Sequence, residues 1–376
     1  MDVIIVGGGV IGLLTARELR AAGAAVTILE RQAPGRESSW AGGGILCPIN
    51  PWQVPEPITR LCGWSQRAYP DFARQLHESS GIDPEWQPSG MLLRASPQDR
   101  QAIEAWGAGH GLAVQYLDAV AAAVAEPNLG EHREAVLLPH VAHIRNPRLL
   151  AALLRDVEQS GVRVLAEHPV HRIDVAGDRV EALETEKGRF RADCYILAAG
   201  AWSEQLASLT GLHLPVQPVR GQMLVFDGQP GWLNHIVIDQ GQYLIPRRDG
   251  RILAGSTVEY AGFDKNTTAD GGAQLAGFAR GLLPPLRNCS IERHWAGLRP
   301  GSPQGIPCIG RHPELGNLYF NCGHFRNGLV MGPASARLLA DLMLGRPPIV
   351  VPEDYAIQAV TGREEIDIRP VTCDLS

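Results

Sequence analysis

The sequence predicts an α/β protein in which a domain built on a parallel sheet is interleaved with a domain built on an antiparallel sheet. Residues 3–6 and 194–200 are short apolar runs, as expected of strands buried on both faces of a parallel sheet. Between residues 216 and 295 apolar and polar residues alternate in short segments, which is typical of antiparallel strands. A length of 376 residues is enough for about two domains.

The order of these patterns along the chain predicts the domain division. Strand-rich segments interrupt the strand-and-helix material twice, so we expect neither domain to be continuous in sequence. We assign residues 1–84, 146–215 and 301–376 to the first domain, and residues 85–145 and 216–300 to the second.

A dinucleotide-binding signature occupies the first 30 residues. Gly7, Gly9 and Gly12 form G-x-G-x-x-G between the strand at residues 3–6 and a helix expected at residues 13–22. A second apolar strand at residues 25–29 follows and ends at Glu30. The complete strand–helix–strand unit is the structural context that this motif requires, and it predicts a Rossmann-like domain.

Each residue of the signature has a physical role. Gly7 permits a tight turn, Gly9 lets the backbone approach a pyrophosphate, and Gly12 lets the helix pack closely on the strand. The pyrophosphate would lie at the positive end of the helix dipole. Glu30 can accept hydrogen bonds from ribose hydroxyls and disfavours a 2′-phosphate, so NADP is not expected. The motif alone does not choose between FAD and NAD.

Composition excludes several other classes. The net charge of -6 is spread along the chain without a basic block, which argues against a nucleic-acid partner. No apolar run approaches the roughly 18 residues of a membrane span. The seven cysteines form no C-x-x-C pair, so we expect neither a metal site nor disulfides, and a reducing compartment. The first residues enter a strand directly, so we expect no secretory signal and a cytoplasmic location.

Several stretches resemble the D-amino-acid oxidase family, and more narrowly its bacterial glycine oxidases. The stretch from Glu30-Arg31 through residues 38–46 resembles the FAD-binding segment, residues 198–203 the second cofactor strand, and residues 218–222 the crossover into the substrate sheet. The closest matches are Trp295-Ala296-Gly297-Leu298-Arg299-Pro300-Gly301 and Gly323-His324-Phe325-Arg326-Asn327-Gly328. The resemblance covers nearly the whole chain in the same order.

The resemblance implies FAD as cofactor and a homotetramer. Residues 292–304 contain no cysteine that could hold the flavin covalently, so we expect non-covalent FAD. Residues 324–330 are expected as a loop before a helix at residues 332–344, with backbone N–H groups facing the flavin N1–C2=O edge. The implied FAD contacts are Val10, Ile11, Glu30, Arg31, Ser38, Ser39, Gly43, Gly44, Ile45, Val170, Gly200, His324, Phe325, Arg326, Asn327, Gly328, Leu329 and Val330.

The implied substrate contacts are Arg299, Tyr243 and Arg326. The planar fork of an arginine makes two parallel bonds to a carboxylate, and we expect Arg299 to present it from a Gly/Pro-rich turn after the antiparallel sheet. Tyr243 either adds a hydroxyl to the same carboxylate or is a half-buried sheet residue. Arg326 either contacts substrate or only fixes its loop. Val258 replaces a methionine found beside the substrate in one family member, which changes the expected pocket volume.

These observations predict oxidative deamination of glycine, sarcosine or small D-amino acids to the 2-oxo acid. Hydride would pass to flavin N5, and O2 would reoxidise the flavin to give hydrogen peroxide. The resemblance implies a place in thiamine biosynthesis. The alternatives are a secondary-amine oxidase of the sarcosine oxidase type, a D-amino-acid dehydrogenase, and a non-catalytic FAD-binding protein, which would not need Arg299.

Overall fold

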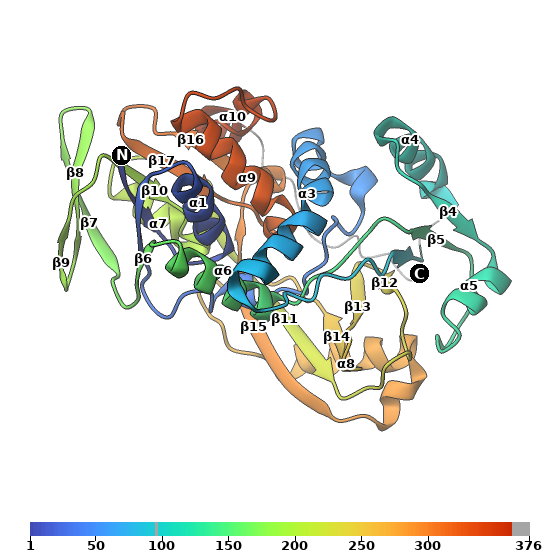
Figure 1. Ribbon diagram of the computed structural model, residues 1–376. Helices are drawn as coiled ribbons and strands as arrows, with labels where there is room; N and C mark the ends of the chain where they lie inside the picture. The colour runs from blue at the N-terminus through green and yellow to red at the C-terminus, as the bar shows by residue number, and fades with distance from the viewer. Residues whose placement is uncertain (95–96, 363–376) are drawn as a thin grey trace.

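The computed structural model describes residues 1–94 and 97–362. Two large sheets form the centre of the molecule, and helices cover them on the outside (Figure 1). The last part of the predicted first domain, residues 363–376, lies outside the described residues, as does Cys373.

The first large sheet carries the predicted strand–helix–strand unit. Its order is β16-β17-β10-β1-β2-β6, parallel throughout except for β16, which is antiparallel to β17. Its strands are β1 (Asp2–Val6), β2 (Ala25–Leu29), β6 (Arg163–Leu165), β10 (Cys194–Leu197), β16 (Cys308–Arg311) and β17 (Leu318–Cys322). The helices α1 (Val10–Ala21), α3 (Glu56–Ser80), α6 (Asn146–Gln159) and α9 (Gly328–Met343) pack together beside it (Figure 1).

The second large sheet is mostly antiparallel, with order β15-β11-β14-β13-β12-β3-β5-β4. Its strands are β3 (Met91–Leu93), β4 (Gln115–Leu117), β5 (Ala135–Leu138), β11 (Gln217–Phe226), β12 (Ile236–Asp239), β13 (Gln242–Pro246), β14 (Ile252–Gly255) and β15 (Ile291–Gly301). Helix α8 (Ala269–Leu282) buries Leu275 and Leu282 in one core cluster with Leu224 and Phe226 of β11.

The remaining elements surround these two sheets. A three-stranded sheet lies at one end of the molecule, and α4 and α5 lie at the other (Figure 1). The strands of the three-stranded sheet are β7 (Val170–Ala176), β8 (Arg179–Thr185) and β9 (Gly188–Phe190). The other helices are α2 (Ser38–Ala41), α4 (Arg100–His110), α5 (Ala119–Ala125), α7 (Ser203–Ser208) and α10 (Ile357–Thr361). The 3-10 helices are η1 (Pro51–Gln53), η2 (Pro97–Asp99), η3 (Gly200–Trp202), η4 (Pro284–Asn288), η5 (Pro303–Gly305) and η6 (Pro352–Tyr355).

Two local predictions were wrong, and both concern the site. Arg299 is not in a turn: it lies on the long strand β15, where it is opposite Val219 of β11. The last long helix begins at Gly328 instead of residue 332, so residues 328–330 form its first turn and not a loop.

The α/β fold with two interleaved sheets is confirmed. Strands of the parallel sheet come from the start, the middle and the end of the chain, and strands of the antiparallel sheet come from the segments between. The residue boundaries of the two domains stay a prediction. Within the described residues, no helix has the length and apolar character that crossing a membrane requires.

Candidate functional site

A cavity of about 1740 Å³ lies between the two large sheets and takes residues from both. Its volume exceeds the roughly 300–1,000 Å³ of a pocket for one small ligand, so it can hold a dinucleotide together with a small molecule. Most of the predicted site residues line it, and Gly12 and Val330 do not. Those that line it are Gly7, Gly9, Val10, Ile11, Glu30, Arg31, Ser38, Ser39, Gly43, Gly44, Ile45, Val170, Gly200, Tyr243, Arg299, His324, Phe325, Arg326, Asn327, Gly328 and Leu329.

The turn between β1 and α1 has room only for glycine at two of the motif positions. Gly7 has φ +114°, and a Cβ there would lie 2.4 Å from the Ala198 carbonyl oxygen. A Cβ on Gly12 would lie 1.9 Å from the Gly7 carbonyl oxygen. The helix therefore packs directly against the turn, as a pyrophosphate-binding turn requires.

Two helix N-termini open into the cavity. At α1, Ser39 Oγ accepts a hydrogen bond from the Val10 N–H (3.0 Å), and the other N–H groups of the first turn have no partner within the helix. At α9, Asn327 makes no side-chain cap, and Gly328 and Leu329 of the first turn line the cavity. Both ends thus offer backbone donors and a positive dipole end to an anionic ligand.

Glu30 is held rigidly at the end of β2. Its two carboxylate oxygens accept hydrogen bonds from the Gly8 N–H (2.7 Å) and the Gln32 N–H (3.0 Å). A carboxylate has about four acceptor sites, so two remain for ribose hydroxyls. Arg31, the next residue, stacks over the Trp202 ring with 3.4 Å between guanidinium carbon and ring centroid, and forms an ion pair with Glu37.

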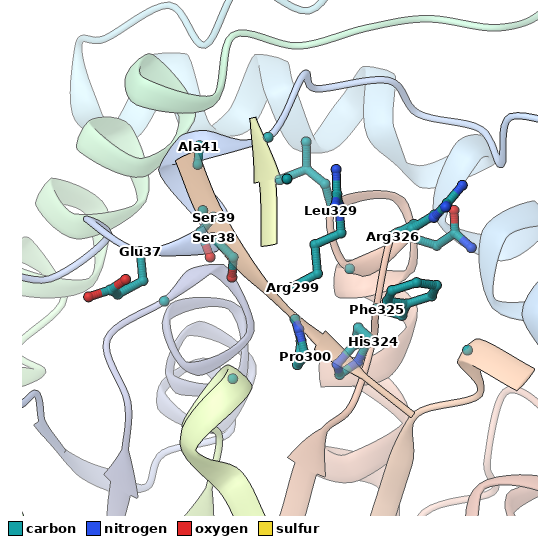
Figure 2. A pocket seen from close by; sticks show the side chains of 18 of the residues that line it. Glu37, Ser38, Ser39, Ala41, Arg299, Pro300, His324, Phe325, Arg326 and Leu329 are labelled. Carbon is teal, nitrogen blue, oxygen red and sulfur yellow. The ribbon is translucent and has the colours of Figure 1, made fainter. Parts of the chain in front are cut away.

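Arg299 extends from β15 into the middle of the cavity (Figure 2). Its Nη2 donates to Ser256 Oγ (2.7 Å), and its Nη1 donates to the carbonyl oxygens of Arg220 (3.3 Å) and Thr257 (3.2 Å). Burial lowers the pKa of its guanidinium from the ordinary value. Sequence reasoning did not identify Ser256 as the residue that orients this fork.

Gly221, which has no Cβ, leaves room for the Arg299 guanidinium. A Cβ on Gly221 of β11 would lie 2.1 Å from Arg299 Nη2 and 2.3 Å from Cζ. The resemblance drew attention to residues 218–222 only as a crossover between sheets. Gly221 also leaves space for the predicted substrate-site arginine, because a larger residue here would displace the Arg299 guanidinium.

Arg326 and Tyr243 lie at the same end of the cavity. Burial, and then the positive charge of Arg299, lowers the pKa of Arg326 to about 10, so it stays charged at neutral pH. Within the described residues neither arginine forms an ion pair with a carboxylate. The Tyr243 hydroxyl donates to Met223 Sδ (3.3 Å), a weak acceptor that a carboxylate could replace.

Figure 2 shows how these residues surround the cavity. Ser38, Ser39 and Ala41 lie on one side, Arg326 lies on the other, and the side chains of Arg299 and Leu329 are between them.

His324 is a buried neutral residue. Ser335 Oγ donates to the Met331 carbonyl oxygen (3.0 Å), so the His324 Nε2, 3.0 Å away, is the donor in their shared hydrogen bond. Burial lowers the pKa of His324 to about 3. It therefore serves as a structural contact between the loop and α9, and its imidazole is uncharged at neutral pH.

Buried neutral histidines should make stability fall in acid. Burial lowers the pKa of both His143 and His324 to about 3, below the usual value of 6.5. The unfolded chain therefore binds more protons between pH 3 and 6.5, so stability rises with pH across that window. Each histidine contributes up to about 1.4 kcal/mol per pH unit. We expect Tm to drop between pH 7 and 5.

Thermal unfolding at both pH values tests this expectation. His143→Asn should reduce the drop in Tm, whereas the same change at the exposed His171 should leave it unaltered. Equal drops in wild type and His143→Asn would rule out buried His143 as a source of the acid sensitivity.

The residues present fit FAD. The two glycines without space for a Cβ, the rigid Glu30 carboxylate and the N-terminus of α1 match an adenosine pyrophosphate, and the N-terminus of α9 offers backbone donors that suit an electron-rich ring system. In the described part of the chain no group of three or more metal-ligating side chains comes together.

Comparison with known proteins agrees with this geometry. The DAO family, described as FAD dependent oxidoreductase, matches residues 2–342. Glycine oxidase of Pseudomonas aeruginosa is 46% identical over 356 residues, covering 94% of this chain and 98% of that protein. The bifunctional protein ThiO/ThiG of Synechocystis is 33% identical, and the match covers 99% of this chain and 56% of that protein.

A solved structure is similar over nearly the whole chain. The crystal structure of glycine oxidase from Geobacillus kaustophilus superposes with a TM-score of 0.90 at 29% identity, covering 95% of this chain and 98% of that one. The family match spans most of the chain and includes every predicted site residue. The chain belongs to the DAO family of FAD-dependent oxidoreductases.

Proposed function

We propose that this FAD-dependent enzyme oxidises glycine, sarcosine or small D-amino acids to the 2-oxo acid, in the manner of the glycine oxidases that it resembles. The observation that carries the proposal is the pair Arg299 and Arg326 at one end of the cavity, two guanidinium groups that form no ion pair with any carboxylate among the described residues. A buried positive charge is costly unless it is paired, so such a pair is suited to an anionic substrate.

The roles of the site residues follow from this arrangement. Arg299, already oriented by Ser256 and two carbonyl groups, binds the substrate carboxylate through its planar fork. Tyr243 donates its hydroxyl to the same carboxylate, and Arg326 adds positive charge beside it. Holding the carboxylate fixes the Cα–H direction, which is the orientation that hydride transfer requires.

Little further protein chemistry is needed. When bound, FAD would supply the hydride acceptor, N5, and its reoxidation by O2 would account for hydrogen peroxide as a product. The N-terminal N–H groups of α9 stabilise negative charge that develops on the ring system. The imine product hydrolyses in water to the 2-oxo acid and the free amine, which is ammonia from a primary amino acid and methylamine from sarcosine. Glycine, O2 and water thus give glyoxylate, ammonia and hydrogen peroxide.

The same proposal includes the remaining cofactor contacts, the oligomeric state, the cellular location and the metabolic pathway of the enzyme. FAD is non-covalent and contacts the predicted residues that line the cavity. Assembly into a homotetramer, cytoplasmic location and a place in thiamine biosynthesis also belong to it, the last supported by the name ThiO/ThiG of a relative.

A substrate panel tests the activity. Purified enzyme is assayed with glycine, sarcosine, D-alanine and L-alanine, recording oxygen uptake and peroxide. We expect glycine, sarcosine and D-alanine to give peroxide and L-alanine to give none. Turnover with a redox dye but without oxygen uptake would identify a dehydrogenase. No turnover with any of the four would contradict the proposal.

Gly221→Ala should weaken substrate binding without affecting the cofactor. The new Cβ would push the Arg299 fork away from its acceptors, so we expect KM to rise about tenfold, the value of one charged hydrogen bond. FAD content should stay at the wild-type level. Gly109→Ala, where a Cβ meets nothing within 4 Å, is the matched control. A wild-type KM for Gly221→Ala would refute the packing argument.

A further inference from the structure

Arg247 is a buried arginine that the mechanism above does not use. It follows β13 directly and is 6% exposed. Its Nη2 donates to the Gly43 carbonyl oxygen (2.7 Å), and its Nη1 donates to the Ile144 carbonyl oxygen (3.1 Å) and to His143 Nδ1 (3.1 Å).

Within residues 1–94 and 97–362, no carboxylate forms an ion pair with Arg247. The two acids whose charges act on Arg247, Glu85 and Asp249, form ion pairs with Arg145 instead. Burial lowers the pKa of Arg247 to about 10, so the guanidinium keeps its proton at neutral pH. A buried cation held only by carbonyl groups and a neutral imidazole is unfavourable for stability alone, which indicates a positional role.

Of the groups that Arg247 holds, Gly43 belongs to the cavity wall, and Ile144 contacts the wall segment that follows Gly43. Gly44 and Leu46 are hydrogen-bonded to Ile144 and Ala142, at 2.9 Å each, and a Cβ on Gly44 would lie 2.0 Å from the Ile144 carbonyl oxygen. These contacts fix one end of the segment formed by residues 43–46. Arg247 fixes the other end by binding Gly43 and Ile144 together.

Gly43 also meets the substrate end of the cavity. A Cβ on Gly43 would lie 3.1 Å from Tyr243 Cε2, so its backbone packs directly against that ring. Gly43, Gly44 and Ile45 all line the cavity, and their N–H groups donate to no acceptor among the residues that the structure describes. These N–H groups are therefore available to the ring of a bound FAD.

We propose that Arg247 is a positioning residue that holds the Gly43–Ile45 backbone in place for the flavin ring, through its bonds to the Gly43 and Ile144 carbonyl oxygens. It touches neither substrate nor cofactor, because Gly43 lies between it and the cavity. The assignment of this end to the flavin ring rests on the proposed function, in which Arg299 and Tyr243 bind the substrate.

Three variants test the proposal by flavin properties. Arg247→Met removes both bonds to carbonyl groups, and Arg247→Lys keeps the charge but cannot span both. Arg248→Met is the matched control, because Arg248 is the next residue and its side chain instead pairs with Asp83 at the surface. The readouts are the visible flavin spectrum, the Kd of FAD after reconstitution, and the Kd of sulfite, which adds to the oxidised flavin ring.

We expect Arg247→Met to raise the Kd of FAD at least about tenfold, the value of one charged hydrogen bond, and to weaken sulfite binding and shift the spectrum. Arg247→Lys should be intermediate and Arg248→Met should match wild type. Wild-type flavin readouts in folded Arg247→Met would overturn the proposal. Should that variant not fold, wild-type readouts in Arg247→Lys would overturn it equally.

These flavin readouts require no amino-acid substrate. A failure of the substrate panel would therefore leave them interpretable, and a failure of the Arg247 proposal would leave the panel unaffected.

Discussion

Arg299→Met is expected to raise KM for the amino-acid substrate about 10- to 200-fold, with FAD content unchanged. The range corresponds to roughly 1.5–3 kcal/mol for hydrogen bonds to a charged group. Methionine keeps most of the side-chain volume in the cavity and removes the fork that binds the carboxylate. If the interaction is equally strong in substrate and transition state, kcat should change little.

Two further variants sharpen this test. Arg299→Lys keeps a positive charge but loses the planar fork, so its KM should lie between wild type and Arg299→Met. Arg293→Met, on an exposed position of the same strand, should behave as wild type. A wild-type KM in Arg299→Met would remove Arg299 from the substrate site.

Gly12→Ala is expected to abolish FAD binding. The new Cβ would overlap the Gly7 carbonyl oxygen at 1.9 Å, and neither atom belongs to a flexible side chain. Helix α1 would have to move away from β1, which distorts the turn that receives the pyrophosphate. The purified variant should be colourless, and after incubation with added FAD and removal of the free cofactor it should show no absorbance of protein-bound flavin.

Gly277→Ala is the matched control for this experiment. Gly277 lies in α8, where a Cβ meets nothing within 4 Å, and alanine is the better helix former by about 1 kcal/mol. It should bind FAD with wild-type affinity. Yellow Gly12→Ala protein with a wild-type Kd would show that the packing of α1 on the turn is not needed for cofactor binding.

The local part of the site was predictable because its residues act within one short segment. The spacing of Gly7, Gly9 and Gly12 between an apolar strand and a helix specifies both the turn and the position of Glu30. The fold class was predicted correctly from such segments, and the FAD cofactor and the family were predicted correctly from the resemblance to the D-amino-acid oxidase family. The start of α9 was placed four residues late, because Asn327 and Gly328 look like loop residues when their tertiary packing is unknown.

The strand that carries Arg299 could not be predicted from its own residues. Gly297, Pro300 and Gly301 are typical of a turn, but they belong to a strand in which ten residues of β15 pair with β11. β15 is at the edge of its sheet, where a proline that cannot donate a hydrogen bond is tolerated. The pairing partner is about 80 residues away in sequence, so local propensity did not report it.

The sequence by itself determined the dinucleotide turn, the order of the two kinds of sheet and the residue types of the site, because these depend on local spacing and composition. Only the tertiary structure decided which groups face one another. The space above Gly221 for the Arg299 fork, the neutral state of His324 and the burial of Arg247 against Gly43 all arise where distant segments pack. Such contacts leave no periodic signal, because each depends on one residue meeting another across the fold.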